Sequence, residues 1–361
     1  MTKALVRCTM VYGLLTAAAA CSAGPAVPDT GGEMATAGRA GVICTASERL
    51  LPVNILQTPA QARRILLIGA ELMLDTEEGL FRLRNHGWEL VLAGGHAYAV
   101  SSDTLIRVVE GKLEIFRYVP GGELQSINSF HLKGNESSSA IVSGEILLHA
   151  ATNENNYLIA RRSLETGAVT GYLLPVGRDF KDLFFNNFER LLDDAGRLHA
   201  FGSLLIFAPY THGPVRLLDL DYGVQYELLT DDRLRGRVVA GTVDTVEYSR
   251  EQACPTCTVN VTVRAKRNPS IEAVHADAIV MGDAAWVLGH DAPGSTRGVV
   301  YRYPIRDGRP GDGMSWHLPA FESRPRSLGI RGDTLYVASE SALYWFETPR
   351  RNASSECART I

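Results

Sequence analysis

Short runs of aliphatic and aromatic residues, broken by small polar residues, make up the C-terminal part of the chain. Three runs cover Ser327–Ile330, Thr334–Ser339 and Ala342–Glu347, and the breaks fall at Gly332-Asp333 and Ser339-Glu340-Ser341. Apolar runs joined through Gly, Asp or Ser are typical of strands in β-hairpins. The sequence therefore predicts three antiparallel strands here, and looser copies of this unit recur upstream at intervals of roughly 30 to 50 residues.

Further groups of predicted strands precede this unit. They cover residues 63–92, 97–132, 140–175, 188–229, 238–263 and 276–318. Long stretches with the i, i+3, i+4, i+7 spacing of an amphipathic helix are missing from the sequence. Many short antiparallel strands leave many open edges, and a ring of small sheets covers most of them, whereas a sandwich does not. We therefore expect an all-β fold, a β-propeller formed by a closed ring of sheets.

The first and last predicted strands are expected to seal this ring. The last unit has only three strands, and the apolar piece Leu50–Leu56 precedes the first full group. We expect Leu50–Leu56 to pair with Ala342–Glu347 and complete a seventh blade; six blades result if the fifth and sixth groups merge. Over roughly residues 50–348 the chain resembles the broad propeller superfamily of NHL- and WD-repeat type. It has no Trp-Asp or NHL signature, so the resemblance implies an architecture and carries over no functional residue.

The N-terminus has the features of an export signal. Lys3 and Arg7 precede the uncharged, mostly apolar stretch Cys8–Ala20, which small residues follow. This stretch is too short to span a bilayer comfortably as a permanent helix. Residues 1–20 are therefore predicted to be a secretory signal peptide.

The end of the signal peptide resembles the bacterial lipobox. The match covers Leu14–Cys21, although Ala18 stands where that motif prefers Leu or Val. The resemblance implies that Cys21 is lipidated and becomes the mature N-terminus, and Ser22 implies retention in the outer membrane. Residues 21–43 would then be the lipidated end and a flexible tether, rich in Gly, Ala, Pro and Thr, ahead of a single domain at 44–357. Cleavage without lipidation, which gives a free secreted protein, is the alternative.

The remaining cysteines suit an exported protein. Of six cysteines, one leaves with the signal peptide and Cys21 is the lipidation site, so an even number is left. An even number in an oxidising compartment favours disulfides. We predict the pairs Cys44–Cys357, near the closure of the ring, and Cys254–Cys257, in a hairpin loop. A thioredoxin-type redox pair or a zinc site at Cys254 and Cys257 is the weaker alternative, since the flanking sequence is β-like and offers no further ligand pair.

The net charge and the absence of local catalytic motifs argue against several classes of function. The chain has 36 basic and 40 acidic residues and a net charge of −4, which argues against nucleic acid as the main partner. It contains none of the local signatures of serine hydrolases, zinc proteases or nucleotide-binding loops. We therefore predict no catalytic residue, no metal and no cofactor. If the protein were instead a metal-dependent propeller hydrolase, its ligands could come from Glu71, Asn153, Asn186, Asn187, Asp193, Asp283 and Asp333, although each is equally explained as a turn residue.

Two acidic segments also have a plain structural explanation. Asp219 and Asp221 share one face of a predicted strand, which is expected to be solvated rather than to hold a cation. Asp307–Gly313 has the composition of a calcium loop but not its spacing, so we expect a polar hairpin there.

The sequence thus favours a non-enzymatic cell-envelope lipoprotein that acts as a binding scaffold. We expect a monomer that is held at the membrane only by its lipid and that binds a protein or envelope component. The predicted contact loops are 209–214, 291–297 and 306–314, presented on one face of the ring. A secreted propeller hydrolase of lactonase or esterase type, with a metal in the central channel, is the alternative function.

Overall fold

The computed structural model describes residues 34–349 except 41–42, 47–48, 86, 102, 110, 120–121, 133–135, 151–156, 176–195, 211–213, 229–235, 240–242, 252–257 and 267–269. The predicted signal peptide and Cys21, Cys254, Cys257 and Cys357 lie outside this range. The elements found within it are β-strands. In this part of the chain there is no helix with the length and apolar character needed to cross a membrane.

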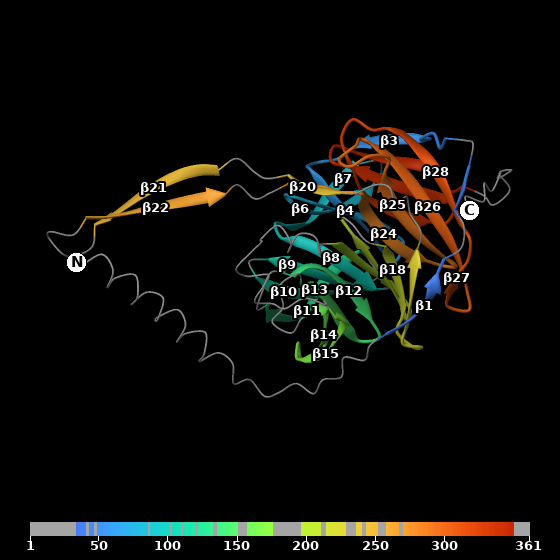
Figure 1. Ribbon diagram of the computed structural model, residues 1–361, viewed down its shortest axis with the longest axis horizontal. Coiled ribbons are helices and arrows are strands. Elements are labelled where there is room, and N and C mark those ends of the chain that lie inside the picture. The colour runs from blue at the N-terminus through green and yellow to red at the C-terminus, as the bar shows by residue number, and fades with distance from the viewer. Residues whose placement is uncertain are drawn as a thin grey trace.

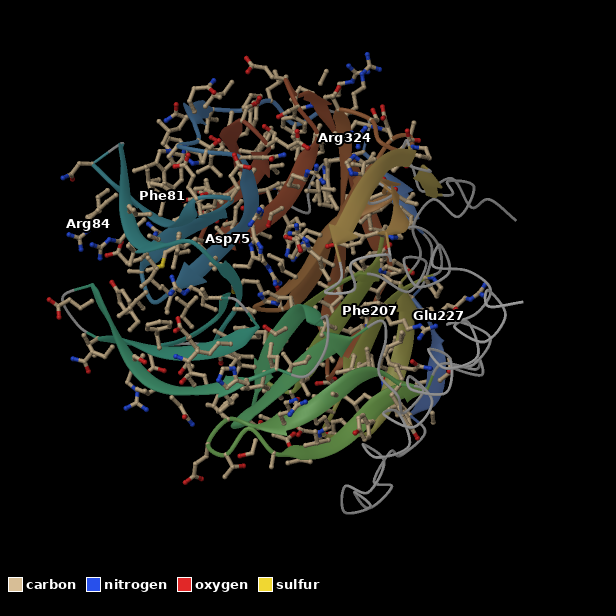
Figure 2. All side chains as sticks on the ribbon, turned by 90° about the vertical axis from the view of Figure 1, so that its left-hand side faces the viewer. Asp75, Phe81, Arg84, Phe207, Glu227 and Arg324 are labelled. Atoms are coloured by element: carbon tan, nitrogen blue, oxygen red, sulfur yellow. The ribbon has the colours of Figure 1, made fainter. Side chains whose placement is uncertain are left out.

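The fold is a six-bladed β-propeller (Figure 1). Figure 2 shows the sheets arranged around a common centre. Blade 1 contains β4 (Ala62–Ile68), β5 (Glu71–Thr76), β6 (Gly79–Arg84) and β7 (Gly87–Ala93). Blade 2 contains β8 (His96–Ser101), β9 (Thr104–Val109), β10 (Lys112–Val119) and β11 (Glu123–His131). Blade 3 contains β12 (Glu136–Val142), β13 (Glu145–Ala150), β14 (Tyr157–Ser163) and β15 (Val169–Pro175).

The other three blades follow in chain order. Blade 4 contains β16 (Gly196–Phe201), β17 (Leu204–Pro209), β18 (Val215–Asp219) and β19 (Val224–Leu228). Blade 5 contains β24 (His275–Met281), β25 (Ala284–His290), β26 (Arg297–Arg306) and β28 (Gly313–Ala320), and β27 (Arg309–Pro310) pairs with β26. Blade 6 contains β29 (Pro325–Arg331), β30 (Thr334–Ser339) and β31 (Ala342–Glu347). Its fourth strand is β3 (Asn54–Gln57), from the other end of the chain.

Apolar side chains between neighbouring blades form the core. Among the described residues, one cluster lies at each of the six junctions, including the junction of blade 6 with blade 1. Strands covered on both faces are mostly apolar, as in β25, where every residue is buried and only His290 is polar. At the closing junction, Leu72 and Leu74 of blade 1 pack in one cluster with Ala338 and Leu343 of blade 6. Successive aromatic residues of β31 pack on both faces of blade 6. Tyr344 and Phe346 pack toward blade 5, and Trp345 packs toward blade 1.

The closure predicted from the sequence is confirmed. Strand β3 pairs antiparallel with β31, with Ile55 opposite Tyr344 and Leu56 opposite Leu343. Two earlier strands add to the outer edges of other blades: β1 (Ala35–Arg39) lies parallel to β19, and β2 (Ile43–Thr45) lies parallel to β28. Residues 35–57, which we call the N-terminal strap, therefore contribute to three consecutive blades. The predicted tether over 21–43 is wrong in its second half, because β1 is already part of a sheet.

The prediction of seven blades is wrong, and the fifth predicted unit explains the difference. It forms two separate pairs, β20 (Arg237–Val239) with β23 (Ser270–Glu272), and β21 (Val243–Glu251) with β22 (Thr258–Lys266). Figure 1 shows β21 and β22 extending away from the ring. The sequence of β22 alternates apolar and polar residues throughout, and that of β21 does so in part, which suits strands with one covered face rather than two. The unit is an insertion between blades 4 and 5 and does not merge with the sixth group.

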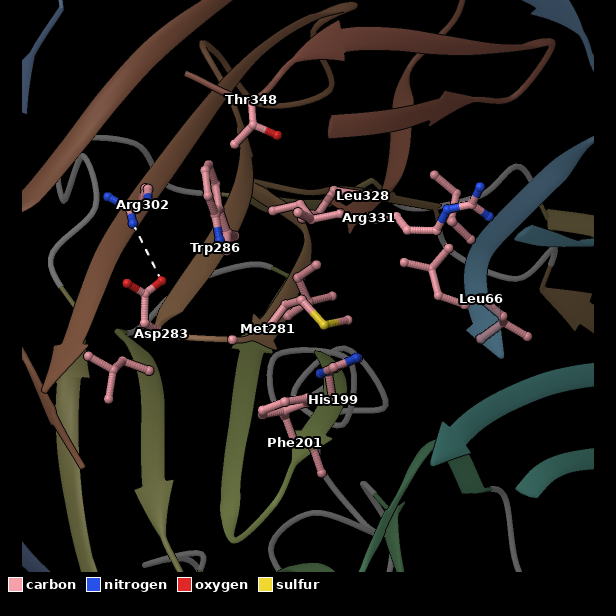
Figure 3. Close-up of a pocket in the computed structure, with 18 of the residues that line it drawn as sticks. Leu66, His199, Phe201, Met281, Asp283, Trp286, Arg302, Leu328, Arg331 and Thr348 are labelled. Atoms are coloured by element: carbon pink, nitrogen blue, oxygen red, sulfur yellow. Dashed lines mark ion pairs between the residues drawn. The ribbon is translucent and has the colours of Figure 1, made fainter. Parts of the chain in front are cut away.

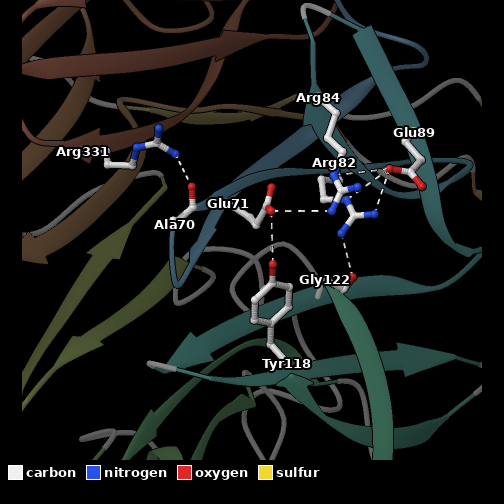
Figure 4. Close-up of polar contacts among 8 residues, drawn as sticks. All are labelled: Ala70, Glu71, Arg82, Arg84, Glu89, Tyr118, Gly122 and Arg331. Atoms are coloured by element: carbon white, nitrogen blue, oxygen red, sulfur yellow. Dashed lines mark hydrogen bonds and ion pairs between the residues drawn. The ribbon is translucent and has the colours of Figure 1, made fainter. Parts of the chain in front are cut away.

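Polar side chains also join neighbouring blades (Figure 4). The Tyr118 hydroxyl of blade 2 donates to Glu71 of blade 1 at 3.2 Å, and Arg82 of blade 1 donates to the carbonyl of Gly122 at 2.7 Å. Arg331 of blade 6 donates to the carbonyl of Ala70 in blade 1. These contacts fix the relative position of blades 6, 1 and 2 around the channel.

Candidate functional site

The central channel contains a cavity of about 1180 Å³. All six inner strands line it: β4, β8, β12, β16, β24 and β29. It also reaches the turns that directly follow inner strands, at Gly69, Gly202, Asp283 and Gly332. The cavity therefore opens at the end of the ring where the inner strands finish, which we call the mouth face. Figure 3 shows Trp286 and Arg302 on one side of the cavity and Leu66 and Arg331 on the other.

Two arginines close the channel away from the mouth. Arg64 of blade 1 donates to the carbonyl of Leu198 in blade 4. Arg197 of blade 4 donates to the carbonyl of Arg63 in blade 1 at 2.8 Å. Blades 1 and 4 are opposite one another in a ring of six, so these two hydrogen bonds cross the channel. Together the two side chains form a polar floor.

Asp277 on β24 neutralises part of this floor. It is 1% exposed, and its carboxylate lies 3.6 Å from the Arg197 guanidinium. It also accepts hydrogen bonds from the Ser327 hydroxyl and from the backbone N–H groups of Leu328 and Ala278. A buried carboxylate needs such donors and a positive partner, because burial alone penalises its charge.

The electrostatics of the two floor arginines differ. Burial lowers the pKa of Arg64, with Asp277 opposing this effect and the charge of Arg197 adding to it. Burial also acts to lower the pKa of Arg197, but Tyr210, which accepts from Nε at 3.0 Å, and Asp277 outweigh it and raise that pKa. Both side chains remain charged, because arginine is not deprotonated in proteins.

His199 and Ser139 complete the lining of the floor. His199 is partly exposed to the channel, and its Nδ1 accepts the backbone N–H of Val280 at 3.2 Å. Burial, reinforced by Arg64 and opposed by Asp277, lowers the pKa of His199 to about 4, so the ring is neutral at pH 7. Its proton then sits on Nε2. The Ser139 hydroxyl is fully buried and has no hydrogen-bond partner.

The mouth is more exposed than the floor and carries both apolar and charged side chains. Phe201 is 45% exposed, and Met281 lies near it in Figure 3. Arg302 packs over the Trp286 ring at 5.5 Å and pairs with Asp283 at 3.5 Å. The lining as a whole includes four arginines and two aspartates, an excess of two positive charges: Arg64, Arg302, Arg306, Arg331, Asp283 and Asp333.

The predicted metal ligands do not gather in this cavity. In the parts of the chain that are described, no group of three or more His, Cys, Asp or Glu side chains could hold a metal ion. Glu71 is occupied by Tyr118 and lies 3.9 Å from Arg84. Asp283 and Asp333 line the mouth, and Asp283 is paired with Arg302. Asn153, Asn186, Asn187 and Asp193 lie outside the described residues.

The other acidic candidates have structural positions. Asp219 is 3% exposed and accepts the backbone N–H groups of Asp221 and Tyr222, so it caps the turn after β18. The expected solvated face is therefore wrong for Asp219. Asp307 and Gly308 both have positive φ, 49° and 72°, at the tip of the β26–β27 hairpin. That conformation is typical of a type I′ turn and confirms the polar hairpin.

The three predicted contact loops do not share a face. Turns of an antiparallel sheet alternate between its two ends, so loops 209–214 and 291–297, after the second strands of blades 4 and 5, lie opposite the mouth. Loop 306–314 follows the third strand of blade 5 and lies on the mouth face. The predicted disulfides stay predictions: Cys44 is buried on β2, and the other three cysteines lie outside the described residues.

Sequence reasoning missed the floor residues because each comes from a different part of the chain. Arg64, Ser139, His199 and Asp277 belong to four blades and share no local motif. One signal was available for Arg64, His199 and Asp277: each is a polar residue within a mostly apolar strand, whereas Ser139 follows three other polar residues. In a strand covered on both faces, such a residue must find a polar partner or a ligand.

Comparisons with known proteins identify no family. No protein-family model matches the sequence, and no curated protein is significantly similar to it. Solved structures with a similar fold include BamB from Moraxella catarrhalis, with 14% identity, a TM-score of 0.41, and coverage of 82% of this chain and 99% of that one. Another is a Trichoderma reesei carbohydrate-active enzyme of family AA12, with 10% identity, a TM-score of 0.44, and coverage of 86% and 99%. Glutaminyl cyclase from Myxococcus xanthus has 12% identity, a TM-score of 0.39, and coverage of 77% and 99%.

Proposed function

We propose that the protein is a non-enzymatic binding module of the cell envelope, anchored through lipidated Cys21, that holds its ligand or partner at the mouth of the central channel. The observation that carries this proposal is the cavity built from all six inner strands. A cavity of this size, with a polar floor and apolar side chains on its walls, is the form that ligand sites usually take. The closed ring holds these side chains in a rigid frame.

The charge of the cavity favours binding over metal-assisted hydrolysis. A divalent cation prefers carboxylate oxygens, whereas the lining carries four arginines against two aspartates, and one of these arginines, Arg302, is paired with Asp283. Glu71 and Asp283 already have cationic neighbours in Arg84 and Arg302. A hydrolase with a metal in the channel remains the competing function, and it requires these ion pairs to open.

Metal analysis and a turnover assay on one preparation distinguish the two functions. The exported protein is incubated with a panel of lactones and aryl esters, with and without calcium or zinc. Binding without turnover, and no stoichiometric metal after dialysis, is the expected result. One tightly held divalent ion per chain, with hydrolysis that is lost in Asp283→Asn or Asp333→Asn, would overturn the binding proposal.

The lipid anchor has its own test. Mass spectrometry of the mature protein from membranes should show an acylated N-terminus at Cys21, and Cys21→Ser should move the protein to the soluble fraction. Several buried acyl chains would hold the protein at the membrane without help from its charge. A mature chain that begins with an unmodified residue would disprove the anchor and leave the channel proposal unaffected.

A further inference from the structure

The channel floor offers hydrogen-bond donors to a ligand, whereas its carboxylate acceptor, Asp277, is already occupied by neighbouring groups. Both oxygens of Asp277 accept from neighbouring groups, Oδ1 from Ala278 and Oδ2 from Ser327 and Leu328. The buried Ser139 hydroxyl has no partner. The proton of neutral His199 sits on Nε2, because Nδ1 accepts from Val280. The His199 Nε2–H can only donate and the Ser139 hydroxyl can donate, so a hydrogen-bond acceptor on the ligand would satisfy both groups.

The charge around these donors specifies the acceptor further. Arg64 lines the cavity and is 6% exposed, so its charge acts through protein rather than through bulk water. Two more arginines, Arg306 and Arg331, lie at the mouth. An anionic acceptor gains from all of these charges, whereas a cation would meet Arg64 at the floor.

The walls above the floor suit an apolar group. Phe201 leaves nearly half of its surface exposed, and Leu66 and Met281 also line the cavity. An exposed phenylalanine in a concave site loses unfavourable contact with water when a ligand covers it. The site is thus polar and positive at its floor, with apolar side chains on the walls above it and further charged side chains at the mouth.

We propose that the channel binds a small amphipathic organic anion, with its carboxylate-like head against Ser139, His199 and Arg64 and its apolar body against Phe201 and Met281. This inference rests on the proposed binding function and names the chemical class of its ligand. Carboxylate, sulfonate and phosphate heads share the required acceptor chemistry.

Isothermal titration calorimetry with matched probes tests this assignment on the exported, full-length chain. 2-Naphthoate carries the acid head on a flat apolar body; 2-naphthamide is its neutral isostere, and 2-naphthylmethylamine is its cationic counterpart. Naphthoate should bind at least about tenfold more tightly than the amide, and the amine should not bind. Acetate and inorganic phosphate, added in excess, should compete with naphthoate and rank the two kinds of head group.

Variants locate the head group. Ser139→Ala and His199→Phe should each weaken naphthoate roughly tenfold, and His199→Gln, which keeps a donor, should retain most of the affinity. Ser129→Ala, on the exposed outer strand of blade 2, is the matched control and should bind as the parent does. Because the Ser139 hydroxyl has no partner, Ser139→Ala should also leave thermal unfolding unchanged or slightly raised, so weaker binding is not a folding defect.

The outcomes separate this inference from the proposed function. Equal affinity for naphthoate and naphthamide, or unchanged binding in Ser139→Ala and His199→Phe, would disprove the inference that the ligand has an anionic head group. Either result would leave the proposed binding function of the channel intact. Absence of binding by every anionic probe would also overturn it. Hydrolysis with a stoichiometric metal, in the assay described above, would overturn the function itself.

Discussion

Asp277 is the residue whose environment most constrains the centre of the molecule. Its carboxylate, 1% exposed, faces Arg197 and accepts from three further donors on blades 5 and 6. A buried ion pair of this kind contributes little net stability by itself, but removing one partner leaves the other charge uncompensated. The floor is therefore more sensitive to substitution than its small size suggests.

Asp277→Asn should destabilise the fold by about 3 kcal/mol or more, because Arg197 and Arg64 lose their compensating charge. Urea unfolding followed by circular dichroism measures the change. Asp283→Asn is the matched control: Asp283 pairs with Arg302 but is 82% exposed, so its loss should cost less than about 1 kcal/mol. Equal effects of the two substitutions would contradict the buried ion-pair network.

Two histidines with strongly lowered pKa values predict acid sensitivity. Burial lowers the pKa of His199 and of His290 to about 4, below the value of 6.5 for an unperturbed histidine. Between pH 6.5 and pH 4 the unfolded chain binds more protons than the folded one, so stability falls as the pH falls through this window. The loss should reach about 3 kcal/mol for each histidine, since each pKa unit corresponds to 1.36 kcal/mol.

Urea midpoints measured from pH 8 to pH 4 check this expectation. His199→Gln should flatten the profile, whereas replacement of exposed His317 by Gln should not. A midpoint that is constant down to pH 4.5 would contradict the neutral state of both rings in the folded protein.

At the scale of single elements, the strap is the feature that most distinguishes this propeller. Its three strands add to the edges of blades 4, 5 and 6, and only the third, β3, closes the ring. Covered edges protect a sheet from pairing with other chains. Among the described strands, the outer strands of blades 1 to 3, β7, β11 and β15, have no such cover.

Truncation separates the parts of the strap. With reductant present throughout, so that the loss of Cys44 has no effect of its own, a chain that begins at Met34 should unfold at the parent temperature, and one that begins at Leu50, without β1 and β2, should unfold roughly 5 °C lower. A chain that begins at Pro59 loses β3 as well and should unfold at least about 10 °C lower, because the ring is no longer sealed. Differential scanning calorimetry gives the comparison. Identical transitions for the chains that begin at Leu50 and Pro59 would show that β3 does not stabilise the closure.

The sequence predicted strand pairing correctly where a predicted strand had no neighbour in its own unit. Leu50–Leu56 and the three-strand last unit each lacked a neighbour, so their pairing followed from the need to cover edges. The blade count failed at β21 and β22, because their strand propensity is high while their alternating polarity leaves one face polar. The channel floor could not be predicted from the sequence. Arg64, His199 and Asp277 come together only because the ring closes, and no spacing along the chain relates them.

At the scale of the whole molecule, the ring behaves as one unit, because every blade has two neighbours and every junction has its own apolar core. A cross-link between the two ends would reinforce this closure. Cys44 lies on β2, in blade 5, close in sequence to the closing strand β3.

The predicted Cys44–Cys357 disulfide closes a loop of roughly 300 residues, for which the chain-entropy model gives a stabilisation of about 5 kcal/mol. Cys357→Ser or reduction should lower the unfolding free energy by an amount of this order. Peptide mapping without reductant should recover the two cysteines together. Recovery of Cys44 as a free thiol, or linked to Cys254, would disprove the pairing.

The distance between β3 and β31 along the chain has a consequence for biosynthesis. Ribosomes add about 5 to 20 residues per second, so β3 emerges roughly 15 to 60 seconds before the strand it must pair with. Throughout that interval β3 has no partner within its own chain and, in the exported protein that we propose, can pair instead with β31 of another copy that has already crossed the membrane. Exchange of this segment between two newborn chains, giving an intertwined dimer with two intact rings, is the misassembly to which this architecture is most exposed.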